Sequence, residues 1–261
     1  MNKDRRFLHR LKDFDLSEPG SKRRYNEELF TPVSQVYPRI TRLLSFGRDA
    51  AWKRSLVDSL PEVQGATVLD LACGPGDLAF LTAERLKGAR VTGIDLNESM
   101  LEKARENLKQ RHPDLQGSVS FAAGDMGELG FPDGHFDVVT GGYALRNAPD
   151  LEGTLGEIRR VLKPGGTAAF LEFSKTGIPL MQGTQLGLLS AWGRLWGSVM
   201  HGNGEVYGYI AESLRHFPDS AGFRSLLEEV GFSVLRYDPV FLGFLRITVA
   251  ERRPSGSGRG W

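Results

Sequence analysis

Two short stretches rich in glycine and aspartate carry the residues best suited to chemistry. The first runs from Val68 to Asp77 and places Gly74 and Gly76 between an apolar β pattern and a helical run. Glycine has no Cβ, so the chain can turn tightly there and a ligand can approach the backbone. Roughly twenty residues further on, a second apolar strand pattern ends in Asp95, whose carboxylate can hold a ribose diol. Together they predict an adenosine-containing cofactor.

The identity of that cofactor depends on charge. The spacing Gly74-x-Gly76-x-x-Ala79 also fits the dinucleotide fingerprint, so NAD is an alternative. Asp70 and Asp77 would repel a pyrophosphate, which binds at helix N-termini as an anion. They would attract the sulfonium and ammonium groups of S-adenosylmethionine. A plain helix cap is the other interpretation of Asp77. The sequence favours S-adenosylmethionine.

Composition sets broader limits on the function. With 261 residues, 40% hydrophobic and 25% charged, the chain is typical of a globular protein. A net charge of +1 gives no reason to expect a nucleic-acid partner. Cys73 is the single cysteine, and the histidines lack ligand spacing, so we expect no metal site. No apolar run is long enough to span a membrane and the N-terminus is charged, which predicts a cytoplasmic protein.

The elements that position these residues follow from periodicity. Residues 66 to about 175 alternate strand and helix patterns, which predicts a parallel sheet covered on both faces. We expect strands near Thr67–Leu71, Arg90–Ile94, Ser118–Ala122, Phe136–Thr140 and Thr167–Leu171, and helices near Leu78–Leu86, Glu98–Lys109 and Leu151–Leu162. A helix over Asp219–Val230 and two strands, Phe232–Tyr237 and Phe241–Val249, joined by Asp238-Pro239, close the chain.

These patterns predict a single domain with short extensions. Residues 1–30 are expected to form a charged N-terminal arm, solvated or as an added helix, and residues 253–261 a flexible tail. Within the domain at 31–252 we expect a helical cover (31–62), a cofactor-binding core (63–175), a lid or substrate segment (176–216) and a closing helix and hairpin (217–252). The apolar, glycine-rich lid stretch fits either a buried helix with a loop or a cover over an apolar substrate.

With these residues in view, the chain resembles the class I S-adenosylmethionine-dependent methyltransferases, and more narrowly the UbiE-type ubiquinone/menaquinone C-methyltransferases. The stretches Leu69–Asp77, Asp95–Leu101 and Leu162–Gly166 are general to the class, whereas Tyr143–Asn147, Leu171–Lys175 and Tyr207–Ser213 are specific to the quinone enzymes. The resemblance runs from about Phe30 to Glu251. It implies a Rossmann-like doubly wound α/β sheet of seven strands with one antiparallel edge hairpin strand, N-terminal helices and a lid insertion.

The resemblance also implies the binding residues. Its cofactor positions fall on Ala72, Gly74, Pro75, Gly76, Asp95, Leu96, Asp125, Met126 and Gly142. Asp125 is suited to accept from the adenine amino group, and Met126 offers a polarisable surface to the ring. The segment Tyr37–Thr41 departs from the family pattern, since it lacks the usual Asp and Asn, which leaves the acceptor ring open.

The implied reaction is in-line attack of a ring carbon on the sulfonium methyl, so the protein mainly aligns the reactants and excludes water. A phenol has a pKa near 10, so a positive group must favour its ionisation. Arg146, oriented by Asn147, is the candidate donor, and a structural ion pair is the alternative. His201 is the candidate base. The candidate substrate-binding residues are Tyr37, Tyr143, Trp196, Tyr207 and Tyr209.

We therefore expect a C-methyltransferase acting on a prenylated quinol, either demethylmenaquinol or a ubiquinone precursor. The alternatives are methylation of a secondary-metabolite ring, an amine or a lipid, an NAD-dependent oxidoreductase, and an idle subunit of a quinone-synthesis complex. Within Ile178–Met200, we expect Trp192, Leu195 and Trp196 to line the route of the prenyl tail or to touch a membrane surface. Peripheral membrane contact follows from that expectation, and a homodimer stays open.

Overall fold

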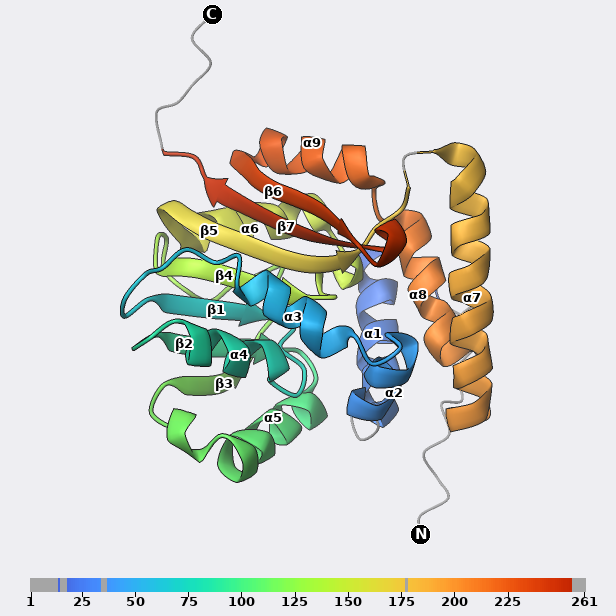
Figure 1. Cartoon of the computed structure of the whole chain (residues 1–261), viewed down its shortest axis with the longest axis horizontal. Coiled ribbons are helices and arrows are strands. Elements are labelled where there is room, and N and C mark those ends of the chain that lie inside the picture. The colour runs from blue at the N-terminus through green and yellow to red at the C-terminus, as the bar shows by residue number, and fades with distance from the viewer. Residues whose placement is uncertain (1–13, 15–17, 34–36, 177, 255–261) are drawn as a thin grey trace, which may run out of the picture.

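A seven-stranded sheet with the order β3-β2-β1-β4-β5-β7-β6 forms the centre of the molecule (Figure 1). The computed structural model describes residues 14, 18–33, 37–176 and 178–254. The strands are β1 (Thr67–Leu71), β2 (Arg90–Asp95), β3 (Val119–Ala123), β4 (Phe136–Gly142), β5 (Leu162–Phe173), β6 (Phe232–Val240) and β7 (Leu245–Arg252). Strands β1 to β5 are parallel, whereas β7 is antiparallel to both β5 and β6. The predicted doubly wound sheet with an edge hairpin is confirmed.

Successive side chains of a strand point to opposite faces of the sheet, and helices cover both of these faces. The helices are α1 (Pro19–Val33), α2 (Tyr37–Leu44), α3 (Asp49–Val57), α4 (Asp77–Arg85), α5 (Glu98–Arg111), α6 (Leu151–Val161), α7 (Pro179–His201), α8 (Glu205–His216) and α9 (Ser220–Val230), with 3-10 turns η2 (Pro113–Leu115), η3 (Leu145–Asn147) and η4 (Phe241–Gly243). Val68 and Val138 pack with α3 and α4 on one face. Leu69 and Val139 pack with α6 and α9 on the other.

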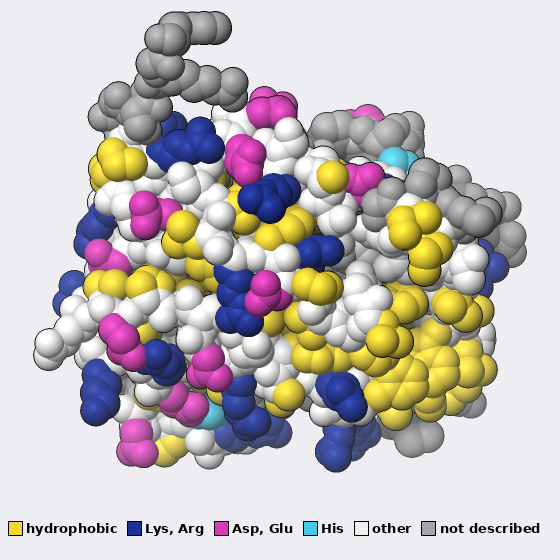
Figure 2. Space-filling view, turned by 45° about the horizontal axis from the view of Figure 1, so that its top comes forward, with side chains coloured by type: hydrophobic (Ala, Val, Ile, Leu, Met, Phe, Trp, Pro, Cys, Tyr) yellow, Lys and Arg dark blue, Asp and Glu magenta, His cyan; other side chains and the backbone are white. Residues whose placement is uncertain are grey.

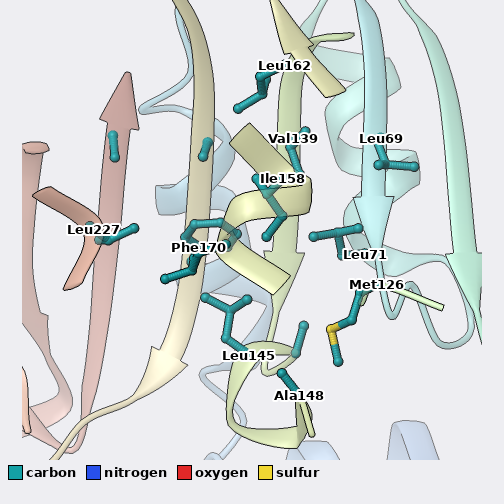
Figure 3. Close-up of a cluster of buried hydrophobic side chains, with 14 of the residues drawn as sticks. Leu69, Leu71, Met126, Val139, Leu145, Ala148, Ile158, Leu162, Phe170 and Leu227 are labelled. Atoms are coloured by element: carbon teal, nitrogen blue, oxygen red, sulfur yellow. The ribbon is translucent and has the colours of Figure 1, made fainter. Parts of the chain in front are cut away.

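The core under α6 extends to the end of the sheet where the strands finish. Figure 3 shows Phe170 of β5 and Val139 of β4 beside Ile158 of α6. At the lower end of the same view, Met126 and Leu145 continue the cluster beyond the strand ends. Core packing therefore reaches the loops that carry the predicted ligand-binding residues.

The closing hairpin turns at a different place from the one predicted. Asp238 and Pro239 lie within β6, and the turn is η4 at Phe241–Gly243. Proline has no N–H for a sheet ladder, which is why the sequence predicts a turn at Asp238-Pro239. It is tolerated here because β6 is the edge strand and pairs only with β7.

The expected boundary of the N-terminal arm at residue 30 falls inside α1. Tyr25 and Leu29, four residues apart on one helical face, are buried against α2 and α8. These two apolar residues stand in a run of charged ones, so the amphipathic pattern is weak in the sequence. Residues 1–13 and 255–261 lie outside the described part, so the solvated arm and the flexible tail stay predictions.

The lid segment contains one long helix, α7, followed by α8, and the two pack side by side (Figure 1). A Cβ on Gly193 would lie 2.3 Å from the carbonyl oxygen of Tyr207, and one on Gly197 would lie 2.6 Å from that of Asn203. These glycines therefore serve close helix packing and not a loop. None of the helices in the described part of the chain is both long and apolar enough to span a bilayer.

This packing predicts opposite effects for two glycines of α7. Gly193→Ala should destabilise the protein by about 1–3 kcal/mol, since the added methyl overpacks the α7–α8 contact. Gly187→Ala is the matched control, because its Cβ would meet nothing within 4 Å and alanine favours a helix by up to about 1 kcal/mol. Urea unfolding measures both changes. Equal stabilisation by the two substitutions would contradict the close contact of α7 with α8.

Candidate active site

The site lies at the carboxyl ends of β1 and β4, where the strand order reverses direction. Both strands are followed closely by a non-glycine residue in the left-handed region, Ala72 at φ 46° and Tyr143 at φ 60°. Such residues cost about 1–3 kcal/mol each and persist where the surroundings fix them. A cavity of about 560 Å³ opens beside them.

This cavity brings most of the predicted site residues together. Its cofactor end includes Ala72, Gly74, Asp95, Leu96, Asp125, Met126 and Gly142, and its other end includes Tyr143, Arg146, Asn147, Trp192, Leu195, Tyr207 and Tyr209. Pro75, Gly76 and Trp196 do not line it. The side chains of Tyr37 and His201 lie outside the described residues, so their predicted roles are untested.

Asp95 is held rigidly by backbone donors. Its carboxylate accepts from the N–H of Gly74 at 2.9 Å and from the N–H of Asn97 at 2.9 Å. Burial raises the pKa of Asp95 above its usual value. A carboxylate offers about four lone-pair positions, so two remain for ligand hydroxyls. The strand β2, the glycine loop and the start of α5 thus position one acceptor.

Gly76 and Pro75 act on the shape of the loop. A Cβ on Gly76 would lie 2.8 Å from ring atoms of both Phe80 and Phe121, and its φ of 91° favours glycine. The carbonyl oxygen of Pro75 accepts from Asn107 Nδ2 at 3.0 Å. Both residues therefore fix the turn that presents Gly74 to the cavity.

Asp70 in β1 and Asp77 at the start of α4 lie on either side of the glycine loop and have different surroundings. Asp70 is 1% exposed and accepts from Thr140 Oγ1 at 2.8 Å, while its Oδ2 finds no partner among the described residues. Burial raises the pKa of Asp70 to about 7. Asp77 instead pairs with Lys53 at 3.0 Å. Neither aspartate lines the cavity, and the raised pKa of Asp70 weakens its negative charge at neutral pH, so the charge argument for a cationic cofactor stays a prediction.

Lys53 links this end of the site to the acceptor end. It also pairs with Asp49 at 2.8 Å, and Asp49 accepts from the Tyr143 hydroxyl at 2.8 Å. Helix α3 thereby positions a tyrosine that lines the cavity. Asp77 is the first residue of α4, so the same lysine connects the glycine loop to Tyr143.

Asp125 and Met126 follow β3 as predicted, but Asp125 is already engaged. Its Oδ1 accepts from the Gly127 N–H at 2.9 Å, and its Oδ2 pairs with Arg23 of α1 at 2.9 Å. Arg23 lines the cavity and was missed, because its basic stretch looks like a solvated one. The contact of Asp125 with adenine stays a prediction.

Arg146 lines the cavity together with Tyr143 and Asn147. Its Nη1 donates to the Tyr143 carbonyl at 2.6 Å and to Glu172 Oε1 at 3.0 Å. Its guanidinium lies 5.1 Å from the centre of the Phe173 ring, and the residue is 6% exposed. Both interpretations made from the sequence, the structural ion pair and the cavity donor, are compatible with this geometry.

Asn147 belongs to a buried polar network that sequence reasoning did not find. Its Nδ2 donates to the Tyr143 carbonyl at 3.1 Å, and its own carbonyl accepts from Asn26 Nδ2 at 3.0 Å. The Tyr209 hydroxyl donates to Asn26 Oδ1 at 2.6 Å. Burial raises the pKa of Tyr209 well above its usual range, so it is a donor and not a base. Asn26 of α1 had no signal in the sequence.

Aromatic side chains line the far end. Phe46 stacks on Trp192 with ring centres 5.0 Å apart, and Phe241 lies 5.8 Å from Phe46. Trp196 meets Trp192 edge-on at 5.7 Å and packs on the cluster of α1, α2 and α8. Trp192 and Leu195 line the cavity and Trp196 does not, and a route for a prenyl tail along them stays a prediction.

Comparison with known proteins agrees with this geometry. The family model described as the ubiE/COQ5 methyltransferase family matches residues 19–251. The chain belongs to the ubiE/COQ5 methyltransferase family. It is 37% identical over 227 residues to a demethylmenaquinone methyltransferase of Thermus thermophilus, covering 86% of this chain and 100% of that one. It is 34% identical to a 2-phytyl-1,4-naphtoquinone methyltransferase of Nostoc punctiforme, covering 87% and 97%.

The fold has a matching neighbour among solved structures. A SAM-dependent methyltransferase from Aquifex aeolicus aligns with a TM-score of 0.54 and 19% identity, covering 76% of this chain and 88% of that one. As a ubiE/COQ5 methyltransferase, the protein is an enzyme of methyl transfer, and its cofactor is S-adenosylmethionine. The NAD-dependent alternative is therefore set aside.

The residues at the cofactor end fit S-adenosylmethionine. Asp95 keeps free lone pairs for the ribose, and Gly74 faces open space, since a Cβ there would meet nothing within 4 Å. The Oδ2 of Asp70 is a buried polar atom without a partner among the described residues, at the end of β1 just before the glycine loop.

The first prediction for this site concerns Asp95. Asp95→Asn should weaken S-adenosylmethionine binding by about 10- to 150-fold, the equivalent of about 1.5–3 kcal/mol for hydrogen bonds to a charged group. Wild-type affinity should also fall as the pH drops through the raised pKa of Asp95, because a protonated carboxyl loses acceptor capacity. Titration calorimetry measures both effects.

Asp114→Asn is the control, because Asp114 is an exposed aspartate in the 3-10 turn η2, whose side chain does not line the cavity. It should leave affinity and its pH dependence unchanged. Equal affinities of the Asp95 variant and the wild type would remove Asp95 from the cofactor site.

Proposed function

We propose that this methyltransferase transfers the methyl group of S-adenosylmethionine to a ring carbon of a prenylated naphthoquinol, with demethylmenaquinol as the leading acceptor. One observation carries the proposal: a single cavity joins a polar end around Asp95 to an apolar aromatic end around Trp192. Arg146 lines the same cavity. The names of the relatives from Thermus thermophilus and Nostoc punctiforme support a naphthoquinone ring as the acceptor.

The residues of the cavity suit carbon methylation of a phenol. S-adenosylmethionine supplies a methyl group on a positively charged sulfur. The acceptor phenol loses its proton, and the ring carbon bonds to the methyl as the carbon–sulfur bond breaks. The ring carbon then loses its proton and the oxygen takes one up, which restores the aromatic quinol. One proton is released in total. Arg146 stabilises the negative oxygen, as a fixed donor does in a water-poor site.

Glu172 and Tyr143 hold Arg146 in place for this role. Glu172 accepts from both the backbone N–H and the guanidinium of Arg146, at 3.2 Å and 3.0 Å, so the side chain has little freedom to turn. The Phe173 ring covers one face of the guanidinium. A preorganised donor of this kind costs no rearrangement during the reaction.

The apolar end suits a long hydrocarbon tail. Leu188, Leu195 and Trp192 of α7 form one wall, and Phe241 and Leu242 of η4 form another. A tail placed there leaves the ring next to Arg146. The same arrangement brings the protein to the membrane that holds such substrates, as a peripheral protein. The substrate named for the Nostoc punctiforme relative carries a phytyl tail, which differs from the tail of demethylmenaquinol. Ubiquinone precursors stay a second acceptor class.

A double variant that replaces both members of the Arg146–Glu172 ion pair with neutral residues can distinguish a catalytic role of Arg146 from a structural one. Arg146→Ala would leave Glu172 buried and unpaired, which costs about 3–5 kcal/mol and obscures the result. In the double variant Arg146→Gln with Glu172→Gln, no lone buried charge is left. It should lower turnover by about a hundredfold or more, with cofactor affinity unchanged. Turnover within tenfold of the wild type in the folded double variant would assign Arg146 a structural role.

The acceptor is tested with quinols of different tails. The wild type should methylate a demethylmenaquinol and leave its already methylated product unchanged. Trp192→Ser should raise the KM for the long-tailed quinol by about tenfold or more, since a buried aromatic surface is lost, and should change turnover of a tail-less ring analogue little. Trp196→Ser is the control, because it packs behind the wall and should lower thermal stability instead.

Equal losses on the tailed and tail-less substrates would contradict the tail route along α7. Failure of the wild type to methylate either ring, with cofactor bound, would contradict the proposed function itself.

A further inference from the structure

The opening of the cavity has an exposed apolar rim. Phe46 is 59% exposed, Leu188 58%, Leu195 52% and Leu242 94%, and all four also line the cavity. These four residues, here called the mouth rim, come from the turn after α2, from α7 and from η4. Figure 2 shows a continuous hydrophobic area on the side of the molecule where Figure 1 places α7. Apolar areas of this kind mark interaction surfaces.

The segments that build the mouth rim are positively charged. Residues 37–57, 175–204 and 239–247 contain eight lysines and arginines and one aspartate, in a chain with 33 basic and 32 acidic residues in total. That aspartate, Asp49, is paired with Lys53 at 2.8 Å. In Figure 2, basic side chains lie beside the hydrophobic area, and acidic side chains are also seen on this face of the molecule. Asp58, Glu205 and Asp238 directly adjoin these ranges, and Lys53 is buried and paired, so the exposed positive charge of the first range comes from Arg39, Arg42, Arg48 and Arg54.

Three of these arginines are available for an external partner. Arg39, Arg42 and Arg48 are exposed, and none has an acidic partner within the part of the chain that the structure describes. Helix α2 turns Ile40 inward, where it is 2% exposed, and presents Arg39 and Arg42 on the opposite side. The helix is thus amphipathic next to the cavity opening.

We propose that the mouth rim docks on an anionic phospholipid surface, with Arg39, Arg42 and Arg48 at the headgroups and Leu242, Leu195 and Phe46 in the acyl boundary. The proposal rests on the proposed function, since a prenylated acceptor is dissolved in such a surface. A bilayer offers hydrocarbon and negative charge side by side, which matches the two chemistries of this face. Apolar docking alone would not need the arginines.

Docking in this orientation has a consequence for the substrate. The mouth rim residues also line the cavity, so the opening faces the acyl region when they are immersed. A prenyl tail can then pass from lipid to the α7 wall without crossing water. The cofactor end, which includes the exposed Leu96, stays on the aqueous side of the molecule in this arrangement.

The test measures binding of the full chain to vesicles of phosphatidylcholine alone and of phosphatidylcholine with added phosphatidylglycerol. The rim variant carries Arg39→Glu, Arg42→Glu and Arg48→Glu. The matched control carries Lys87→Glu, Arg90→Glu and Lys109→Glu, three exposed cations near the start of β2 and the end of α5, at the opposite end of the sheet from the cavity. The two variants therefore change the net charge equally.

We expect the wild type to prefer the vesicles with phosphatidylglycerol and to lose that preference in high salt. The rim variant should bind them at least about a hundredfold more weakly, since it loses three cations that each contribute roughly a fivefold factor and gains three anions. The control should stay within about threefold of the wild type. Leu242→Asp should weaken binding to both kinds of vesicle. Equal binding of the rim and control variants, or no vesicle binding by the wild type, would overturn the proposal.

Two further readouts distinguish lipid docking from a loss of catalysis and from self-association. Methylation of a tail-less quinol in the absence of vesicles should be the same in the wild type, the rim variant and the control. If the wild type lacks this activity, the proposed function fails, while the vesicle comparison still decides the docking. A wild-type dimer that Leu242→Asp separates, without vesicle binding, would assign the face to a second copy and overturn the lipid assignment.

Discussion

The rest of the site depends on a buried ion pair between Arg146 and Glu172, which holds the loop after β4 in place. Glu172 is the penultimate residue of β5, the strand next to β4, and its carboxylate accepts from both the backbone N–H and the guanidinium of Arg146. Arg146 in turn binds the carbonyl of Tyr143, a residue in the left-handed region that leads out of β4. The pair therefore holds the loop after β4, whose residues line the cavity.

The same constraint explains why segments distant in sequence converge here. The Tyr143 carbonyl also accepts from the side-chain amide of Asn147, and the backbone carbonyl of Asn147 accepts from Asn26 of α1. The Tyr143 hydroxyl donates to Asp49 of α3. Lys53 carries the connection on to Asp77 at the start of α4. Helices before the first strand thus form part of the cavity wall. The sheet supplies rigid strand ends, and the added helices supply the acceptor side.

Much of this arrangement could be predicted from local patterns in the sequence. Strand and helix periodicity, the glycine loop and Asp95 follow general rules of parallel sheets, so the fold and the cofactor end were within reach. The turn of the closing hairpin was not, because Pro239 signals a turn unless the strand is known to lie at an edge. Asn26 and Arg23 were missed because their contacts depend on how α1 packs, which no local pattern reveals. The ion pair of Lys53 with Asp77 could not be predicted from a local pattern either, because the two residues lie far apart in the sequence.

The central claim is that one cavity brings the methyl donor to a ring carbon of a tailed quinol. Turnover with S-adenosylmethionine labelled with ¹³C in its methyl group tests this directly, by nuclear magnetic resonance of the extracted product of demethylmenaquinol. The account predicts a labelled methyl that shows one-bond coupling to a ring carbon when the ring is also labelled. A labelled methyl on oxygen, or no label in the quinol while cofactor is bound, would contradict it.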